Sequence, residues 1–285
     1  MTLRRGPVMA VLVSLAAVLT GSTAAATMSP VSPTAEPEQV PVAMPEPTIA
    51  QGLGFDTCTA PSVAALQAWW GTSPYETVNI YFGGLNRGCR QPNLTPEWVQ
   101  SVTGIGWGLL PTYMGHQPSC MLGNKPHRFT EANASSIGTS DAEDAVAQAQ
   151  ALGLLSGSAL YADVEHYDRT DSSCVNAVRN YVSAWVRTLH AAEYRAGVYV
   201  HQNSGLIDLS AVYDSPDHAR PDAVWMARWD GNPALTGWPT APDSQWSNHQ
   251  RAKQYLGDHD ETWGGVTINI DSDSLDAPIA TVAGR

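Results

Sequence analysis

Two acidic residues stand two positions apart at the end of a short apolar run, residues 159–164. They are Asp163 and Glu165. Side chains of a β-strand alternate between its faces, so both carboxyls would point to the same side, roughly 6–7 Å apart along the strand. Carboxylates that close raise one another's proton affinity, which can leave one as an acid and the other as an anion. The alternative is that both residues only cap the following loop and helix.

Two further acids, Asp56 and Asp271, each end another predicted strand. If the strands close into a barrel, the first and last are neighbours, so these two residues would lie side by side, opposite Asp163 and Glu165. Glycoside hydrolysis needs such a cleft, with a protonated carboxyl and an anion flanking the scissile bond. The pattern therefore predicts four catalytic candidates: Asp56, Asp163, Glu165 and Asp271.

The elements that would position these acids alternate between strand and helix. Strands are predicted at 53–56, 77–82, 107–114, 159–164, 196–200, 223–229, 253–256 and 266–270, and helices at 61–70, from 95, at 140–152 and at 172–192. Eight strands separated by helices predict an α/β protein with a (β/α)8 TIM-like barrel. The helices after the fifth to seventh strands look short or missing, so we expect that side to be irregular. A doubly wound sheet is the runner-up, although no glycine-rich phosphate loop follows any strand.

Several aromatic and amide side chains fall near the same strand ends and are candidates for binding a sugar. Tyr199 and Trp229 would stack on sugar rings, while Tyr81 and Gln254 would donate hydrogen bonds. Tyr113, near the end of the third strand, is predicted to bind substrate with them. The alternative for each is ordinary filling of the barrel.

Four cysteines, Cys58, Cys89, Cys120 and Cys174, predict two disulfides if the chain is exported, and three connectivities are open. Cys89 with Cys120 is the preferred pair, because the strands before them should be adjacent. No two cysteines are spaced as in a CxxC pair, which argues against a zinc site, and we expect neither a metal nor another cofactor.

The first residues have the pattern of a secretory signal peptide, predicted at 1–26. It has a basic start, an apolar run too short to span a membrane and a small-residue cleavage site. Residues 27–51 are rich in proline and predict a disordered linker. Residues 52–285 would form one barrel domain. We therefore expect a secreted or envelope-associated monomer.

Charge narrows the choice of partner. Cleavage after residue 26 would remove Arg4 and Arg5 and no acid, taking the formal net charge from −12 to −14. So acidic a chain should bind neither nucleic acid nor an anionic membrane surface. Ten Trp and ten Tyr suit a protein with aromatic surfaces for sugars. A polysaccharide is the expected partner.

At this point the sequence resembles a known family. The motifs are Gly-Phe-Asp-Thr-Cys-Thr-Ala-Pro-Ser (54–62), Asn-Arg-Gly-Cys-Arg-Gln-Pro-Asn-Leu-Thr (86–95), Leu-Pro-Thr-Tyr (110–113), Tyr-Ala-Asp-Val-Glu (161–165) and Trp-Gly-Gly-Val-Thr-Ile-Asn-Ile-Asp-Ser-Asp (263–273). They resemble the secreted actinobacterial glycoside hydrolase-like domain family, long of unknown function. That family is in turn similar to the family 25 glycoside hydrolases, the Chalaropsis-type lysozymes, which are barrel muramidases. The resemblance implies a barrel in which Asp56, Asp163, Glu165 and Asp271 are the acidic positions and Glu165 is the acid.

Three functions remain open at this stage. The first is a secreted glycosidase acting on cell-envelope glycan, most of all peptidoglycan, in which Glu165 protonates the leaving oxygen with a pKa raised by its acidic neighbours. The second is a non-catalytic glycan-binding module that has kept the cleft. The third is a structural envelope protein in which Asp271 and Asp273 hold Ca²⁺.

Overall fold

A computed structural model describes residues 44–284 of the chain. The predicted signal peptide, 1–26, and most of the predicted linker, 27–51, lie outside the described residues. The first strand, β1, spans Thr48–Asp56. Residues 48–51 pair with the last strand of the barrel, so the barrel begins before the predicted boundary at Gly52.

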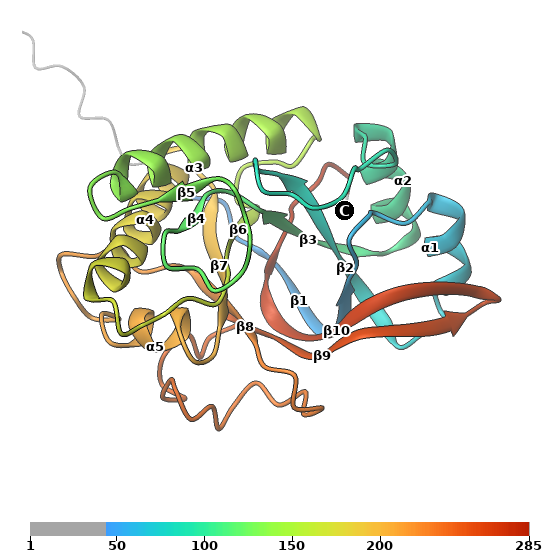
Figure 1. Cartoon of the computed structure of the whole chain (residues 1–285). Helices are drawn as coiled ribbons and strands as arrows, with labels where there is room; N and C mark the ends of the chain where they lie inside the picture. The colour runs from blue at the N-terminus through green and yellow to red at the C-terminus, as the bar shows by residue number, and fades with distance from the viewer. Residues whose placement is uncertain (1–43, 285) are drawn as a thin grey trace, which may run out of the picture. The chain divides into compact units, whose positions relative to one another are not determined.

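Eight strands close into a barrel in the order β1-β10-β9-β8-β7-β6-β3-β2 (Figure 1). Beside β1, they are β2 (Tyr75–Gly83), β3 (Gly108–Tyr113), β6 (Ala159–Val164), β7 (Arg195–His201), β8 (Ala223–Ala227), β9 (Arg251–Trp263) and β10 (Val266–Ile279). A small separate sheet pairs β4 (Gln117–Pro118) with β5 (Arg128–Phe129). The predicted irregular TIM-like α/β barrel is confirmed.

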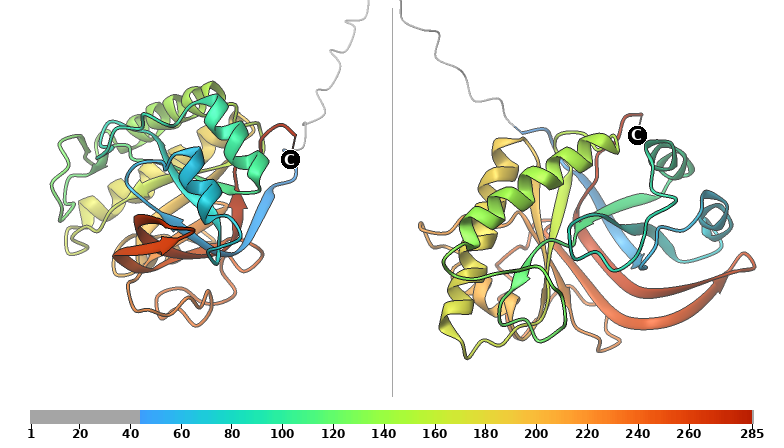
Figure 2. Two further views of the ribbon diagram at one scale, coloured as in Figure 1. Left: turned by 90° about the vertical axis from the view of Figure 1, so that its right-hand side faces the viewer. Right: turned by 45° about the horizontal axis from the view of Figure 1, so that its top comes forward.

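Five helices occur among residues 44–284, four of them where the sequence predicts one. They are α1 (Val63–Trp69), α2 (Pro96–Ile105), α3 (Ala134–Ala151), α4 (Ser172–Ala191) and the short α5 (Gly205–Ser210). Helices α1 and α2 lie on one side of the barrel and α3 and α4 on another (Figure 2). In the described part of the chain, no helix follows β8 or β9, which accounts for the predicted irregularity.

The start of α3 differs from its prediction. The sequence predicts this helix from residue 140, but it already begins at Ala134. The side chain of Asp141 accepts hydrogen bonds from the His116 backbone N–H, at 2.9 Å, and from the Tyr181 hydroxyl, also at 2.9 Å. Asp141 therefore ties α3 to the loop after β3 and to α4.

The direction of the last strand is the main departure from the expected barrel. Strand β10 runs antiparallel to both β9 and β1, and it continues well past Asp271, which was predicted to end it. A two-residue turn causes the reversal: Gly264 and Gly265 have φ of 56° and 80°, and glycine adopts such values readily. A tight turn of this kind can only join antiparallel strands. The Gly-Gly pair is the feature of the sequence that indicates this turn, and the prediction of a parallel last strand did not take it into account.

Apolar side chains fill two layers. The outer layer lies between barrel and helices and contains Trp69 and Trp185, both fully buried. The inner layer fills the barrel around Tyr161 and Trp225. The Tyr161 hydroxyl donates to the Pro278 carbonyl at 2.8 Å. Its ring lies so close to Gly197 that a Cβ there would come within 2.3 Å of it, so this position accepts only glycine.

Two disulfides form, as predicted, but the preferred pairing is wrong. Cys58 is bonded to Cys89 and Cys120 to Cys174, with Cα–Cα distances of 5.7 and 6.1 Å. Each bridge joins segments that follow neighbouring strands, β1 with β2 and β3 with β6. The long loop after β3 carries Cys120 toward Cys174 of α4, and Met121 of this loop pairs with Tyr167, between β6 and α4, in an isolated bridge. The predicted pair, Cys89 with Cys120, also follows neighbouring strands, so strand order alone could not decide the pairing. The path of the loop after β3 decides it.

Within residues 44–284, no helix is long and apolar enough to cross a membrane.

Candidate active site

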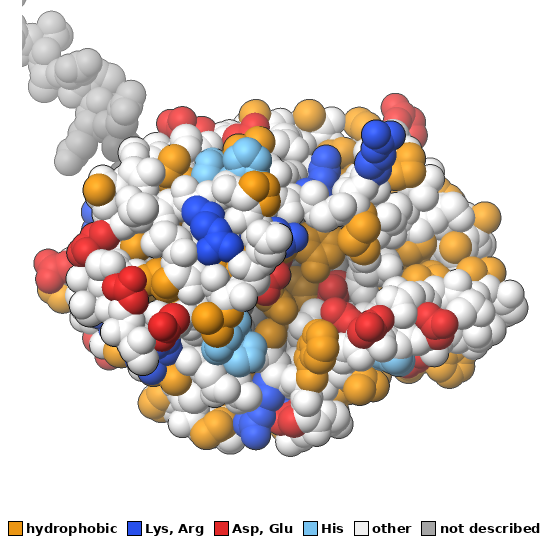
Figure 3. Space-filling model, viewed as in Figure 1, with side chains coloured by type: hydrophobic (Ala, Val, Ile, Leu, Met, Phe, Trp, Pro, Cys, Tyr) orange, Lys and Arg blue, Asp and Glu red, His pale blue; other side chains and the backbone are white. Residues whose placement is uncertain are grey.

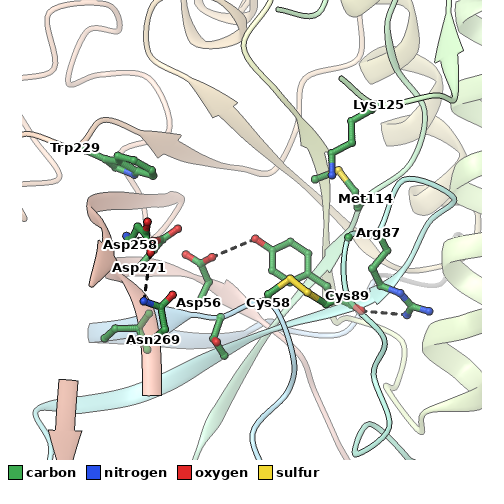
Figure 4. Close-up of a pocket in the computed structure, with 14 residues that line it drawn as sticks. Asp56, Cys58, Arg87, Cys89, Met114, Lys125, Trp229, Asp258, Asn269 and Asp271 are labelled. Carbon is green, nitrogen blue, oxygen red and sulfur yellow. Dashed lines mark hydrogen bonds between the residues drawn. A yellow bond between two sulfur atoms is a disulfide. The ribbon is translucent and has the colours of Figure 1, made fainter. Parts of the chain in front are cut away.

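A cavity of about 310 Å³ opens where the barrel's parallel strands end. It is lined by residues of β1, β2, β9 and β10 and of the loops after β1, β2, β3 and β8, among them Asp56, Tyr81, Lys125, Trp229, Asp258 and Asp271. The space-filling view shows the hollow, with acidic side chains gathered along the edge formed by β9 and β10 (Figure 3). The close-up shows how the labelled side chains surround it (Figure 4).

Asp56 and Asp271 are direct cross-strand partners, as predicted, although β10 runs in the opposite direction to that expected. Gln254 of β9 holds them together. Its amide Nε2 donates to Asp56 Oδ2 at 2.7 Å and to Asp271 Oδ2 at 3.1 Å. The Tyr81 hydroxyl donates to the other oxygen of Asp56, Oδ1, at 3.1 Å. Both oxygens of Asp56 are therefore fixed in place.

Gln254, which the sequence predicts to donate hydrogen bonds to substrate, is a hub of hydrogen bonds within the site. Its Oε1 accepts from the Tyr199 hydroxyl at 3.0 Å and from Trp229 Nε1 at 2.8 Å. An amide has two donor hydrogens and two acceptor lone pairs, and Asp56, Asp271 and the two aromatic residues occupy all four. The residue is also 2% exposed. It positions the carboxylates and aromatic rings and has nothing left for a sugar.

We expect a Gln254→Leu variant to be destabilised by about 1–3 kcal/mol, because it leaves buried polar groups without partners while keeping similar bulk. The pKa of Asp56 should rise further, since Gln254 lowers it. Urea denaturation and NMR titration of the Asp56 carboxyl would measure both effects. Gln100→Leu, on an exposed face of α2, is the control. A Gln254→Leu protein with unchanged stability would contradict the assignment of Gln254 as a hub.

A β-bulge shapes the pocket wall beside Asp271. The register of β10 against β9 shifts on both sides of Ser272. Asp258 has a left-handed backbone with φ of 46°, a conformation that Asp adopts more readily than most residues. Its backbone N–H donates to Asp271 Oδ1. Bulges often re-aim side chains beside functional sites, and this one supplies a hydrogen bond that favours the charged form of Asp271.

Asp163 and Glu165 lie at the end of β6, but neither lines the cavity itself. Asp163 is 3% exposed and its Oδ1 has no hydrogen-bond partner. Glu165 is half-buried. Gln117 holds the backbone of both residues, because its Nε2 donates to the Asp163 carbonyl at 2.6 Å and its Oε1 accepts from the Glu165 N–H at 3.0 Å. The charge of Glu165 contributes to raising the pKa of Asp56, and the charge of Lys125 lowers that of Glu165, so the two pairs of acids lie within electrostatic range of one another.

Burial raises the pKa of all four carboxyls. It raises that of Asp56 to about 7, with the charge of Asp271 as the next cause. It raises that of Asp163 well above its ordinary value, and Glu165 adds to the effect. The pKa of Glu165 is raised by burial, against the lowering influence of Lys125, so the predicted direction is right although burial replaces neighbouring charge as its cause. Burial also raises the pKa of Asp271.

Three of the four predicted aromatic residues lie at the site, and the fourth, Tyr113, does not. Tyr81 and Trp229 line the cavity, and Trp229 is 61% exposed. Tyr199 lies beneath them on Gln254. Tyr113 is buried outside the barrel, where its hydroxyl donates to Asp144 Oδ2 of α3 at 2.6 Å. The structure therefore separates Tyr113 from the predicted binding residues.

Asp273, the second residue of the calcium alternative, lies inside the barrel. It is 1% exposed, and its Oδ1 accepts from Trp225 Nε1 at 3.0 Å while Oδ2 has no partner. Burial raises its pKa well above the ordinary value, and Asp56 adds to the effect. No group of three or more His, Cys, Asp or Glu side chains within residues 44–284 is arranged to hold a metal ion.

Lys125 also lines the cavity, although no pattern in the sequence points to it. It comes from the long loop after β3, and its Nζ donates to the Asn86 carbonyl at 3.1 Å. A lone lysine in a loop between strands has no spacing pattern that would point to a site. Only the fold brings it to the acidic residues.

An irregular α/β barrel with acidic residues around a pocket at the ends of its strands is the architecture of glycoside hydrolase-like proteins. The chain belongs to the family described as "Rv2525c-like, glycoside hydrolase-like domain", whose model matches residues 67–275. This confirms the family resemblance found in the sequence. No curated protein matched the chain significantly.

Solved structures with the same fold include the Mycobacterium tuberculosis Tat-secreted protein Rv2525c. In its complex with HEPES it is 16% identical, with 80% of this chain and 96% of that chain covered and a TM-score of 0.53. In its complex with L-tartrate the identity is 14%, the coverage 79% and 96%, and the TM-score 0.52. A muramidase from Acremonium alcalophilum is 15% identical over 79% of this chain and 93% of that chain, with a TM-score of 0.48.

Proposed function

We propose that this protein is a secreted glycoside hydrolase acting on cell-envelope glycan, with peptidoglycan as the preferred substrate. The observation that carries the proposal is that Asp56 and Asp271 line the pocket side by side, while Glu165, at the end of β6, is near enough for its charge to raise the pKa of Asp56. The cavity volume of about 310 Å³ is at the lower end of the range for ligand pockets, about 300–1,000 Å³. Burial raises the pKa of these carboxyls, and glycoside hydrolysis needs one protonated carboxyl beside one anion.

The environment of each acid suggests its role. Glu165, half-buried and with a raised pKa, would donate a proton to the glycosidic oxygen. Asp271 is best suited to be the anion, because the Asp258 N–H and the Gln254 amide both donate to it. Its charge would stabilise the oxocarbenium-like transition state or form a covalent bond to the sugar. Asp56, with a pKa of about 7, would keep Asp271 in place and is the rival candidate for the acid.

Trp229 and Tyr81 would form the sugar-binding surfaces. The Trp229 indole packs against Gly257, where an added Cβ would lie 2.2 Å from its ring, and its Nε1 is tied to Gln254. The ring is held at one edge and leaves most of its surface open. A rigid, exposed aromatic face is what a sugar ring stacks on at low entropic cost.

A non-catalytic glycan-binding module is the alternative, and one observation favours it. Asp163 and Glu165 do not line the cavity, and the two predicted acids that do, Asp56 and Asp271, already accept hydrogen bonds from Gln254. A sugar bound only by Trp229 and Tyr81 could lie out of reach of Glu165. This arrangement would retain binding without turnover.

The proposed compartment agrees with the covalent structure. Both disulfides, Cys58–Cys89 and Cys120–Cys174, leave no free cysteine among the described residues, and disulfides persist in oxidising, extracytoplasmic environments. We propose that residues 1–26 direct export and that the barrel acts as a monomer outside the membrane.

The test is turnover of purified sacculi by the exported protein, with release of soluble reducing ends as the readout and sedimentation with sacculi as the measure of binding. Hydrolysis requires both to be positive. A protein that sediments with sacculi but releases nothing would establish the binding module instead. A protein that does neither would refute both functions.

We expect Trp229→Ala to weaken glycan binding roughly 3- to 10-fold, the value of one aromatic contact. Stability should change little, because the side chain is 61% exposed. Sedimentation at several sacculus concentrations would measure the affinity, and thermal unfolding would check the fold. Unchanged affinity in a folded variant would exclude Trp229 from the sugar-binding surface.

A further inference from the structure

The cavity has two unlike walls (Figure 4). One wall carries Asp56, Asp258 and Asp271, together with Trp229. The opposite wall carries two cations, Arg87 and Lys125. A neutral sugar needs no cation, so the second wall calls for an explanation beyond the binding of an uncharged ring.

The guanidinium of Arg87 has a structural role. Its Nη1 donates to the carbonyls of Tyr81 and Phe82, both at 3.2 Å. These carbonyls belong to the end of β2, so Arg87 anchors the loop after that strand. The charge of Arg87 therefore contributes to the wall, but part of its hydrogen-bonding capacity is used within the protein.

Lys125 differs from Arg87 because most of its hydrogen-bonding capacity is not used within the described part of the protein. A comparison with the other lysine of the chain makes this clear. Lys125 and Lys253 are the only lysines in the sequence. Lys253 is 2% exposed and forms an ion pair with Asp230 at 2.8 Å. Lys125 is half-buried and forms no such pair with any residue in 44–284; its one hydrogen bond is to the Asn86 carbonyl, at 3.1 Å. An ammonium has three donors, so two remain for a ligand.

The position of Lys125 is fixed before any ligand arrives. Asn86 is 4% exposed, and its side chain holds the loop on both sides: Nδ2 donates to the carbonyls of Gly115 and His127, each at 2.8 Å, and Oδ1 accepts from the His127 N–H at 3.2 Å. The Asn86 carbonyl then accepts from Lys125 itself. One buried amide therefore preorganises the ammonium at the cavity wall, which lowers the cost of ordering it on binding.

We propose that Lys125 binds a carboxylate carried by the sugar in this cavity, and so selects acidic over neutral sugars. The inference rests on the proposed function, because the cavity must accept a glycan. A carboxylate is an acceptor-only anion, and hydrogen bonds between charged groups are about twice as strong as neutral ones. The same lysine lowers the pKa values of Asp163 and Glu165, so the acidic sugar would lie next to the bond that Glu165 is proposed to cleave.

The test compares disaccharides that differ only in a carboxylate, with affinities measured by calorimetry at low salt. One pair is N-acetylglucosaminyl-N-acetylmuramic acid against N,N′-diacetylchitobiose, which differ in the lactyl ether that carries the carboxylate. The other pair is cellobiouronic acid against cellobiose, which differ in a uronate. Wild-type protein should prefer the acidic member of at least one pair by about 10-fold or more, as expected for a hydrogen bond between charged groups. The pair that shows the preference identifies the source of the carboxylate.

Lys125→Met keeps the length of the side chain but loses its charge, and its affinities for the two members of that pair should become equal. Lys125→Arg should restore most of the preference, and added salt should reduce it in the wild type. A preference that persists in Lys125→Met, equal affinities in the wild type, or no binding of any probe would overturn the inference. Cleavage of sacculi without a preference for acidic sugars would overturn the role of Lys125 and leave the proposed hydrolysis intact. A preference for acidic sugars without cleavage would overturn only the proposed hydrolysis.

Discussion

Glu165→Gln should reduce turnover of sacculi by roughly 10²–10⁴-fold, the usual contribution of general acid catalysis. The amide has nearly the shape of the acid, but it cannot deliver a proton. Binding should survive, because Glu165 does not line the cavity and its backbone N–H remains held by Gln117. Initial rates of reducing-end release, together with sedimentation, would measure the two effects separately.

Asp56→Asn distinguishes the two candidate acids. If Glu165 is the acid, Asp56→Asn should keep the alkaline limb of the pH–rate profile, where a general acid loses its proton, and lose rate through misplacement of Asp271, its cross-strand partner. If Asp56 is the acid, its removal should abolish the limb near pH 7 that its pKa of about 7 sets. Glu143→Gln, on the exposed face of α3, is the matched control and should retain full activity.

The fold of the Glu165→Gln variant must be checked in the same experiment. Burial raises the pKa of Glu165, so neutralising it should leave stability unchanged or increase it at neutral pH. A variant that unfolds would show that the residue is structural. A folded variant with full turnover would show that another group is the acid.

The sequence located the acidic residues more reliably than it described the strands that carry them. Asp56 and Asp271 were expected side by side because the first and last strands of a closed barrel are neighbours. That argument holds for either strand direction, so it survived the reversal of β10 at Gly264 and Gly265. Closure of the barrel makes β1 and β10 neighbours, whereas the direction of β10 depends on the local turn before it.

Positions within a fully buried strand were harder to predict. All six residues of β3 are buried, so the alternation of polar and apolar residues that usually identifies the inner face is missing. In the structure Leu110 belongs to the inner layer and Thr112 receives a hydrogen bond from the interior residue Asn79. Tyr113 is therefore turned outward to Asp144. Nothing in the sequence of this strand shows which of its side chains face the barrel interior and which face the helices.

The roles of polar residues at the site depended on partners that sequence cannot supply. Gln254 was placed correctly near the mouth, yet its four hydrogen bonds come from β1, β7, β10 and the segment after β8. Whether an amide is free for a ligand or fully used by the protein is decided only when such distant segments meet. The same holds for Lys125, which reaches the cavity from a long loop.

The buried acids make a further prediction about pH and stability. An acid whose pKa is higher in the folded than in the unfolded state binds more protons when folded, so the free energy of unfolding falls as pH rises between the two values. For Asp56 the window runs from its ordinary pKa of 3.8 to about 7, and the cost above it is on the order of 4 kcal/mol. Asp273, fully inside the barrel with Oδ2 unpartnered, should act in the same direction.

Asp273→Asn should therefore be more stable than the wild type at pH 8, by at least about 1 kcal/mol, because a buried carboxylate without a counter-charge has been removed. The difference should shrink toward pH 4, where the wild-type carboxyl is protonated. The amide can still accept from Trp225 Nε1, so packing should be preserved. Urea denaturation of both proteins at pH 5 and pH 8 measures the change, and the comparison between variant and wild type cancels the titration of all other groups.

Asp214→Asn is the control for this experiment, since the Asp214 side chain is 89% exposed and lies 4.0 Å from Arg220, its one ion-pair partner among residues 44–284. Its effect should be small and the same at both pH values. If Asp273→Asn showed a gain that did not depend on pH, packing would be the cause. If Asp273→Asn lost stability at both pH values, a partner would hold Asp273 ionised in the folded protein. The raised pKa of Asp273 would then be wrong.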